Sequence, residues 1–210
     1  MILFEIKSIS KKYRAFFFIL AEKFRIMKRD DALKLVDTYI KNEKMRIHCL
    51  SSEAVMRALA KHFNEDVEKW GLAGLLHDLD VEITHADLNI HGLESVKILT
   101  QLNVDTEIVE AIRMHNENAH GDKRHKLIHH ALAAGETITG LIYATALVYP
   151  DKRIESVKVK SVTKRMKEKA FAASVNRDII MECELIGLSL DAFTEIALNA
   201  MKEIAGEIGL

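Results

Sequence analysis

The stretch GLAGLLHDLD, residues 71–80, joins an apolar run directly to a histidine and an aspartate. The small and apolar residues from Gly71 to Leu76 predict a helix that is buried near its end. Ionised carboxylates are almost never fully buried unless they are paired or bound to a metal ion. The dipeptide His77-Asp78 at the end of this run therefore indicates a polar site inside the fold.

Composition predicts an all-α protein with one sizeable core. The 210 residues are 49% hydrophobic, and nine glycines and one proline leave few helix breakers. A net charge of -1 gives no overall field that attracts nucleic acid, so we expect no nucleic-acid partner and leave a homo-oligomer open. Cys49 and Cys183 match no zinc-ribbon or redox spacing, and we expect buried free thiols.

The apolar run from Ala15 to Ala21 is much shorter than the roughly 20 residues that a membrane span requires. Charges flank this run and no clear cleavage site follows, which argues against a signal peptide. We interpret residues 1–29 as an N-terminal helical extension, either a docking helix or a stretch translated upstream of a start at Met27. We expect a cytoplasmic protein with no membrane partner.

Helical periodicity continues through the rest of the chain. We expect a core over residues 30–150 and C-terminal helices over 151–210 that pack on it as one globular domain. Within the core, helices are expected at about 45–62, 64–76, 91–102, 105–115 and 127–148. The expected N-terminal caps are Asp30 or Asp31, Asn64, Asp105 and Ser189.

Histidine is the compositional outlier, because eight of the ten histidines lie between His77 and His130. Imidazole and carboxylate ligands suit Fe, Mn, Co, Ni or Zn better than calcium or thiophilic metals. Helical cores form such sites from side chains on facing helices. Six residues could bind one or two divalent transition-metal ions in this way: His48, His77, Asp78, His91, His115 and Glu136.

The ordered segments around these residues resemble the HD superfamily of metal-dependent phosphohydrolases, from about Met45 to Val148. RIHCLSSEAVMRALA (residues 46–60) is similar to the helix with the first histidine, and residues 71–80 are similar to the HD signature. HGLESVKILTQL (91–102) and EAIRMHNEN (110–118) resemble the later histidine segments of two-metal members. ALAAGETITGLI (131–142) stands where the family usually has Ala-Asp and an apolar helix.

The resemblance implies an HD-type helical bundle and assigns its metal ligands. Asp78 would be shared by both ions and, with His77, would be the catalytic pair. The implied ligands are His48, His77, Asp78 and Glu136 for a first ion, and Asp78, His91 and His115 for a second. The chain differs from the family pattern at Glu136, which replaces an aspartate, and at Asp80-Val81, where a lysine often follows the motif.

The resemblance further implies hydrolysis of a phosphomonoester or phosphodiester, in a nucleotide or other small phosphate ester, by a metal-activated water. Bacterial enzymes of the dinucleoside tetraphosphatase type are the better comparison among two-metal members, since no Gly-Tyr-Pro motif follows His115. The alternatives are a non-catalytic nucleotide- or protein-binding module on the same scaffold, and a structural helical protein with scattered histidines. The candidate substrate-binding residues are His120, Lys123, Arg124, His129 and Arg177.

Overall fold

The computed structural model describes residues 27–210, so the expected extension over residues 1–29 lies almost wholly outside the described part of the chain. Within residues 27–210 every regular element is a helix, which confirms the all-α prediction. None of the helices in this range is both long enough and apolar enough to cross a bilayer.

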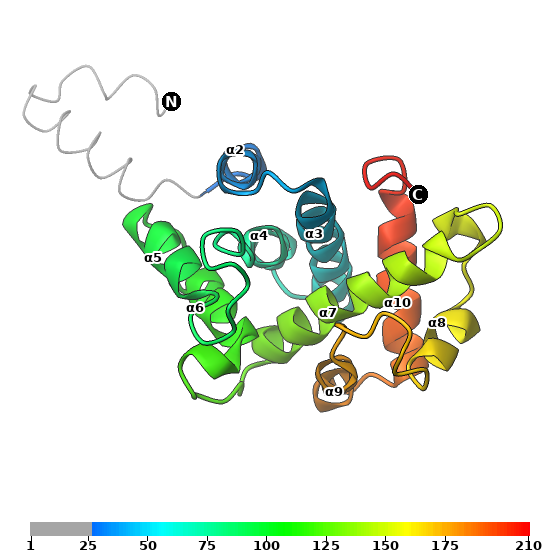
Figure 1. The fold of residues 1–210 in the computed structure, drawn as a ribbon. Helices are drawn as coiled ribbons and strands as arrows, with labels where there is room; N and C mark the ends of the chain where they lie inside the picture. Colours follow the sequence, from blue (N-terminus) through cyan, green and yellow to red (C-terminus); the bar gives the residue numbers. More distant parts are fainter. Residues whose placement is uncertain (1–26) are drawn as a thin grey trace, which may run out of the picture.

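The elements follow the order expected from the sequence, with additional short helices near the C-terminus (Figure 1). They are α2 (Arg29–Tyr39), α3 (Glu43–Phe63), α4 (Val67–Leu76), α5 (Leu93–Gln101), α6 (Thr106–His115), η2 (Glu117–Ala119), α7 (Leu127–Leu147), η3 (Ile154–Ser156), α8 (Val159–Arg165), α9 (Arg177–Ile180), η4 (Met181–Ile186) and α10 (Leu190–Glu203).

Two of the expected helix caps are correct. Asp105 accepts a hydrogen bond from the backbone N–H of Glu107 at the start of α6. Ser189 accepts one from the backbone N–H of Ala192 at the start of α10. These short polar side chains satisfy N–H groups that have no partner inside the helix.

The other two cap predictions are wrong. Asn64 has a φ of 57° and ends α3 in the left-handed conformation, which asparagine tolerates, and Asp66 caps α4 instead. Helix α2 begins at Arg29 without a side-chain cap, so Asp30 and Asp31 lie in its first turn. Their negative charges there interact favourably with the helix dipole.

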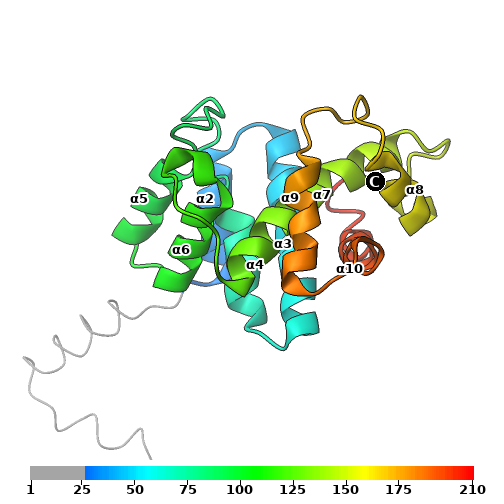
Figure 2. The ribbon, with the colours of Figure 1, turned by 90° about the horizontal axis from the view of Figure 1, so that it is seen from below.

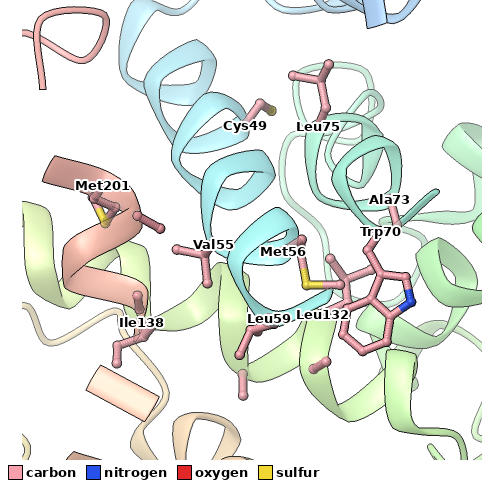
Figure 3. Packing of buried hydrophobic residues seen from close by; sticks show 14 of the residues in the cluster. Cys49, Val55, Met56, Leu59, Trp70, Ala73, Leu75, Leu132, Ile138 and Met201 are labelled. Atoms are coloured by element: carbon pink, nitrogen blue, oxygen red, sulfur yellow. The ribbon is translucent and has the colours of Figure 1, made fainter. Parts of the chain in front are cut away.

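Helices α3, α4 and α7 form the centre of the core, and α7 runs from α6 at one end to α8 at the other (Figure 1). Figure 3 shows Met56 and Leu59 of α3 among Trp70 of α4 and Leu132 of α7. Gly74 lets α4 approach α3 closely, since a Cβ there would lie 2.5 Å from the carbonyl oxygen of Ser52. This approach brings the end of α4 next to the first turns of α3.

The C-terminal segment packs on this core. Helix α10 contacts α3, while α9 and η4 pack against α7, and α9 crosses α7 (Figure 2). Within the expected C-terminal helices of residues 151–210, the structure has a short α9 followed by the 3₁₀ helix η4. Cys49 and Cys183 are buried and free, as expected. The boundaries at residues 30, 150 and 151 stay predictions.

Candidate metal centre

The first group of polar side chains lies where α4 ends against α3. Nε2 of His48 on α3 is 3.1 Å from Nε2 of His77, the residue that ends α4. Asp78 follows in the turn, with its Oδ2 3.5 Å from Nε2 of His48 and its Oδ1 3.3 Å from Nε2 of His77. These three residues present potential ligand atoms within 4.8 Å of one another.

A second group shares Asp78. Its Oδ1 lies 3.0 Å from Nε2 of His91, which precedes α5, and 3.7 Å from Nε2 of His115 at the end of α6. The two Nε2 atoms of His91 and His115 are 3.1 Å apart. Asp78, His91 and His115 also lie within 4.8 Å of one another and all three are buried. Asp78 therefore stands between two histidine pairs that come from four parts of the chain.

The Nδ1 atoms of the four histidines all face away from the centre toward oxygen atoms. His77 Nδ1 donates to the carbonyl of Gly74 at 2.8 Å, and His115 Nδ1 donates to the carbonyl of Ile112. His48 Nδ1 donates to the hydroxyl of Thr139 at 3.0 Å, since that hydroxyl donates its own proton to the carbonyl of Glu136. Partners of this kind fix the tautomer of metal-ligating histidines.

This arrangement fits a bound cation. When Nδ1 is the only protonated nitrogen on each ring, the Nε2 lone pairs of His48 and His77 face each other across 3.1 Å. Two such lone pairs repel unless a proton or a metal ion lies near both. Two imidazoles bound to one ion at about 2.0–2.1 Å have nitrogens about 3.0–3.4 Å apart at ordinary coordination angles. The donor set of imidazole and carboxylate suits a divalent transition metal.

Burial and neighbouring charges shift the pKa values in this centre. Burial lowers the pKa of His48 to about 4, and burial together with the nearby His77 lowers the pKa of His115 to about 3. Both rings are therefore neutral at pH 7, which is the form that binds metal. Burial would also lower the pKa of His91, but Asp78 and Asp80 outweigh it and raise that pKa to about 10.

Asp78 stays ionised in spite of its burial. Burial acts to raise its pKa, but the surrounding histidines outweigh that effect and hold the pKa well below its usual range. Glu136 differs, since burial raises its pKa to about 8. Its Oε2 lies 3.6 Å from Nε2 of His48, at the edge of the first group, and its Oε1 accepts a hydrogen bond from Thr137. Its role as a metal ligand stays a prediction.

Asp80 is a residue whose role sequence reasoning missed. Its side chain is fully buried, and its Oδ2 accepts hydrogen bonds from the backbone N–H groups of Gly92, Glu94 and Ser95 at the start of α5. Its Oδ1 lies 2.9 Å from Nδ1 of His91. The available signal was a further aspartate directly after the apolar run and His77-Asp78, but the sequence did not reveal which segment it contacts.

A cavity of about 420 Å³ opens above the histidines and Asp78. One part of its wall is formed by the candidate ligands His48, His91, His115 and Glu136. Leu88 and Asn116 line it from neighbouring loops. The remaining wall comes from the C-terminal segment, through Ser174, Val175, Asn176 and Ile179. The candidate metal-ligating side chains thus border a cavity that a small molecule can enter.

The residues expected to bind substrate lie outside the described lining of this cavity. Arg124 donates to Glu182 and to the carbonyls of Met114 and His115, so that its charge holds the end of α6. His120 pairs with the carbonyl of Arg113, and Lys123 pairs with Glu117. The placement of these three residues does not support the predicted phosphate contacts.

The other two expected substrate residues are also occupied or enclosed. His129 is fully buried, and neither of its ring nitrogens has a hydrogen-bond partner among the described residues. Arg177 donates to backbone carbonyls of the loop that precedes α9, including those of Ala172 and Val175 at 2.6 Å each. Its contact with the cavity is therefore indirect, through the loop that it holds.

The all-helical fold and the two histidine pairs around Asp78 define an α-helical protein with a candidate centre for divalent metal ions. The family model of the HD domain matches residues 45–164, which is more than half of the chain. The chain therefore belongs to the HD domain family, as the motifs indicate, and most members of this family are metal-dependent hydrolases. No curated protein and no solved structure matches the chain.

Proposed function

We propose that this chain is a metal-dependent phosphohydrolase that acts on a nucleotide or another small phosphate ester. The single observation that carries the proposal is the position of Asp78 between two histidine pairs. Its Oδ2 lies 3.5 Å from Nε2 of His48, while its Oδ1 lies between Nε2 of His77 at 3.3 Å and Nε2 of His91 at 3.0 Å. A carboxylate within reach of both histidine pairs suits a ligand shared by two ions.

The residues of the chain would divide the work as follows. His48 and His77 would hold a first ion through their Nε2 atoms, with Glu136 as an additional oxygen ligand. His91 and His115 would hold a second ion, and Asp78 would bind both. When bound, divalent ions of this kind lower the pKa of water and neutralise phosphate charge. The native ion would be Fe, Mn, Co, Ni or Zn.

The protein would also position the substrate and exclude bulk water, and positioning with charge stabilisation is its main contribution to phosphoryl transfer in general. Leu88, Val175 and Ile179 line the cavity with apolar surface beside the ligand set. A substrate bound there would displace water and present its phosphorus to the floor of the cavity. A volume of about 420 Å³ lies within the range of small-molecule sites.

A metal and activity assay tests the proposal. Protein purified without chelators is analysed for transition metals, then incubated with Mn²⁺ or Fe²⁺ and with p-nitrophenyl phosphate, bis-p-nitrophenyl phosphate and a nucleotide panel. We expect bound metal and hydrolysis of at least one ester, both lost in Asp78→Ala and kept in the control Asp87→Asn, which changes an exposed carboxylate of the same loop.

The alternative is a non-catalytic binding module on the HD scaffold. Lysine and arginine are absent from the described lining of the cavity, an observation that favours this reading over a phosphatase with a cationic anchor. Protein without bound metal, and without hydrolysis of any ester after addition of Mn²⁺ or Fe²⁺, would favour the binding module and overturn the proposed activity.

A further inference from the structure

The wall of the cavity opposite the helical core comes from a segment that the family match does not cover. The match ends at residue 164, while Ser174, Val175 and Asn176 belong to the loop before α9, and Ile179 belongs to α9 itself. We name residues 168–176 the α9 loop. The α9 loop therefore lies outside the part of the chain that the HD domain model matches.

Two arginine side chains, Arg177 and Arg165, hold the α9 loop in place. The guanidinium of Arg177 donates to the backbone carbonyls of Phe171, Ala172 and Val175. Arg165 adds a cation–π contact with its guanidinium carbon 4.9 Å from the ring centroid of Phe171. Several hydrogen bonds from one planar guanidinium fix the carbonyls relative to one another. The α9 loop thus presents a defined wall to the cavity.

The side chains that the α9 loop contributes to the cavity wall carry no charge. Ser174 and Asn176 contribute a hydroxyl and an amide beside the apolar Val175. The Oδ1 of Asn176 is used by the backbone N–H groups of α9, whereas the hydroxyl of Ser174 has no hydrogen-bond partner among residues 27–210. Asn118, which also lines the cavity, likewise offers a side-chain amide without a described partner.

Charge balance then limits what the cavity can accept. The described lining holds two carboxylates, Asp78 and Glu136, and no lysine or arginine. Two divalent ions would supply the positive charge that one phosphate group needs, and the described lining adds no cationic side chain to them. Nearby cationic groups are occupied elsewhere, Arg124 by Glu182 and Lys123 by Glu117. A second anionic group on the substrate would therefore find no cationic side chain in the described lining to pair with.

We propose that the α9 loop selects phosphate monoesters whose organic group is uncharged and carries hydrogen-bonding groups on an apolar body. This inference rests on the proposed function and adds the substrate class. Esters that carry a further phosphate or carboxylate are disfavoured, because the wall that faces their organic group offers hydroxyl, amide and apolar surface only.

Two esters that differ by one charge test the inference. The Mn²⁺-loaded full chain is assayed with 4-carbamoylphenyl phosphate and 4-carboxyphenyl phosphate, which are close in size. The readout is the ratio of kcat/KM where the esters are hydrolysed and the ratio of Kd from calorimetry where they are not. We expect the neutral ester to be favoured about tenfold or more, as one unpaired desolvated charge requires.

A variant with a positive charge in the cavity wall is compared with the wild-type chain. Ser174→Lys places a cation on the cavity side of the α9 loop, and we expect the preference for the neutral ester to shrink at least severalfold. Ala173→Lys is the control, since Ala173 is the exposed neighbour of Ser174 and does not line the cavity. The metal content of both variants is measured to show that the ions are retained.

The outcomes separate this inference from the proposed function. Equal or better use of the carboxylate ester by the wild-type chain, or an unchanged ratio in Ser174→Lys, would overturn the inference even when hydrolysis is robust. Binding of both esters with the expected ratio but without hydrolysis would support the inference and count against the phosphohydrolase. Binding of neither ester would overturn the inference.

Discussion

Asp80, in the turn after α4, lies against the start of α5, with its Oδ1 2.9 Å from Nδ1 of His91. Its other oxygen accepts backbone hydrogen bonds from Gly92 and Ser95 at the start of α5. One buried carboxylate therefore fixes both the orientation of the His91 ring and the position of the helix behind it. The arrangement makes Asp80 a positioning residue for the second histidine pair.

Asp80→Asn should weaken the second metal position selectively. An amide keeps one hydrogen-bond acceptor for α5, but it removes the negative charge that faces Nδ1 of His91. Partners of this kind are worth about 10–100-fold in metal affinity. We expect metal content near one ion per chain at limiting Mn²⁺, measured by mass spectrometry of the metal. Asp87→Asn is the control, and two retained ions in Asp80→Asn would contradict the positioning role.

Asp78→Ala and His91→Ala should differ in metal stoichiometry. Removal of Asp78 takes a ligand from both groups, so we expect the loss of both ions and of hydrolysis. Removal of His91 affects the second group alone, so one ion should remain at the pair of His48 and His77. Metal analysis on gel-filtered protein gives the answer, and full metal content in Asp78→Ala would refute the shared-ligand assignment.

The metal-free protein should lose stability in mild acid through His115. Burial and the nearby His77 lower its pKa from 6.5 to about 3. Between these two pH values the imidazole is protonated in the unfolded chain but neutral in the folded chain. Stability is thus intact above pH 6.5 and falls as the pH drops below it. We expect His115 to contribute a loss of about 1 kcal/mol between pH 7.5 and 5.5.

The comparison variant for this pH effect is His115→Asn. Its amide can still donate to the carbonyl of Ile112, as Nδ1 of the histidine does, but it does not titrate. Urea unfolding of the metal-free proteins at pH 7.5, 6.5 and 5.5 measures the difference. A wild-type curve that declines no faster than that of His115→Asn would show that the ring takes up its proton in the fold.

Arg177→Lys should raise KM with little effect on kcat. A lysine ammonium cannot reproduce the planar set of donors that holds the carbonyls of Phe171, Ala172 and Val175. The α9 loop would then be less ordered, while the metal ligands would be untouched. We expect a severalfold higher KM for a phosphate monoester, unchanged metal content and faster proteolysis within residues 168–176.

The control for Arg177→Lys is Arg153→Lys, an exposed arginine whose partner is Glu155. A fall in kcat together with lost metal in Arg177→Lys would mean that the loop supports the metal centre itself. That result would contradict the assignment of separate roles to the α9 loop, in substrate binding, and to the candidate metal ligands.

The sequence alone determined the all-α class and the order of the ligand-bearing helices. Both follow from local properties: apolar spacing at the helical period, few helix breakers, and histidines at the ends of the apolar runs. These signals also placed His77 and Asp78 at the end of α4, where the structure has them. The sequence did not single out the cap of α4, because Asn64 and Asp66 are both suitable N-cap residues within three positions.

Only the tertiary structure decided which polar side chains face the cavity. Long cationic side chains can reach many partners, and Arg124 pairs with Glu182, which is 58 residues further along the chain. The partners of Asp80 could not be inferred from the sequence either. They become its neighbours only when the loop of residues 79–92 folds back onto the start of α5. The wall supplied by Ser174 depends on the packing of the α9 loop over α7, a long-range contact that no local pattern encodes.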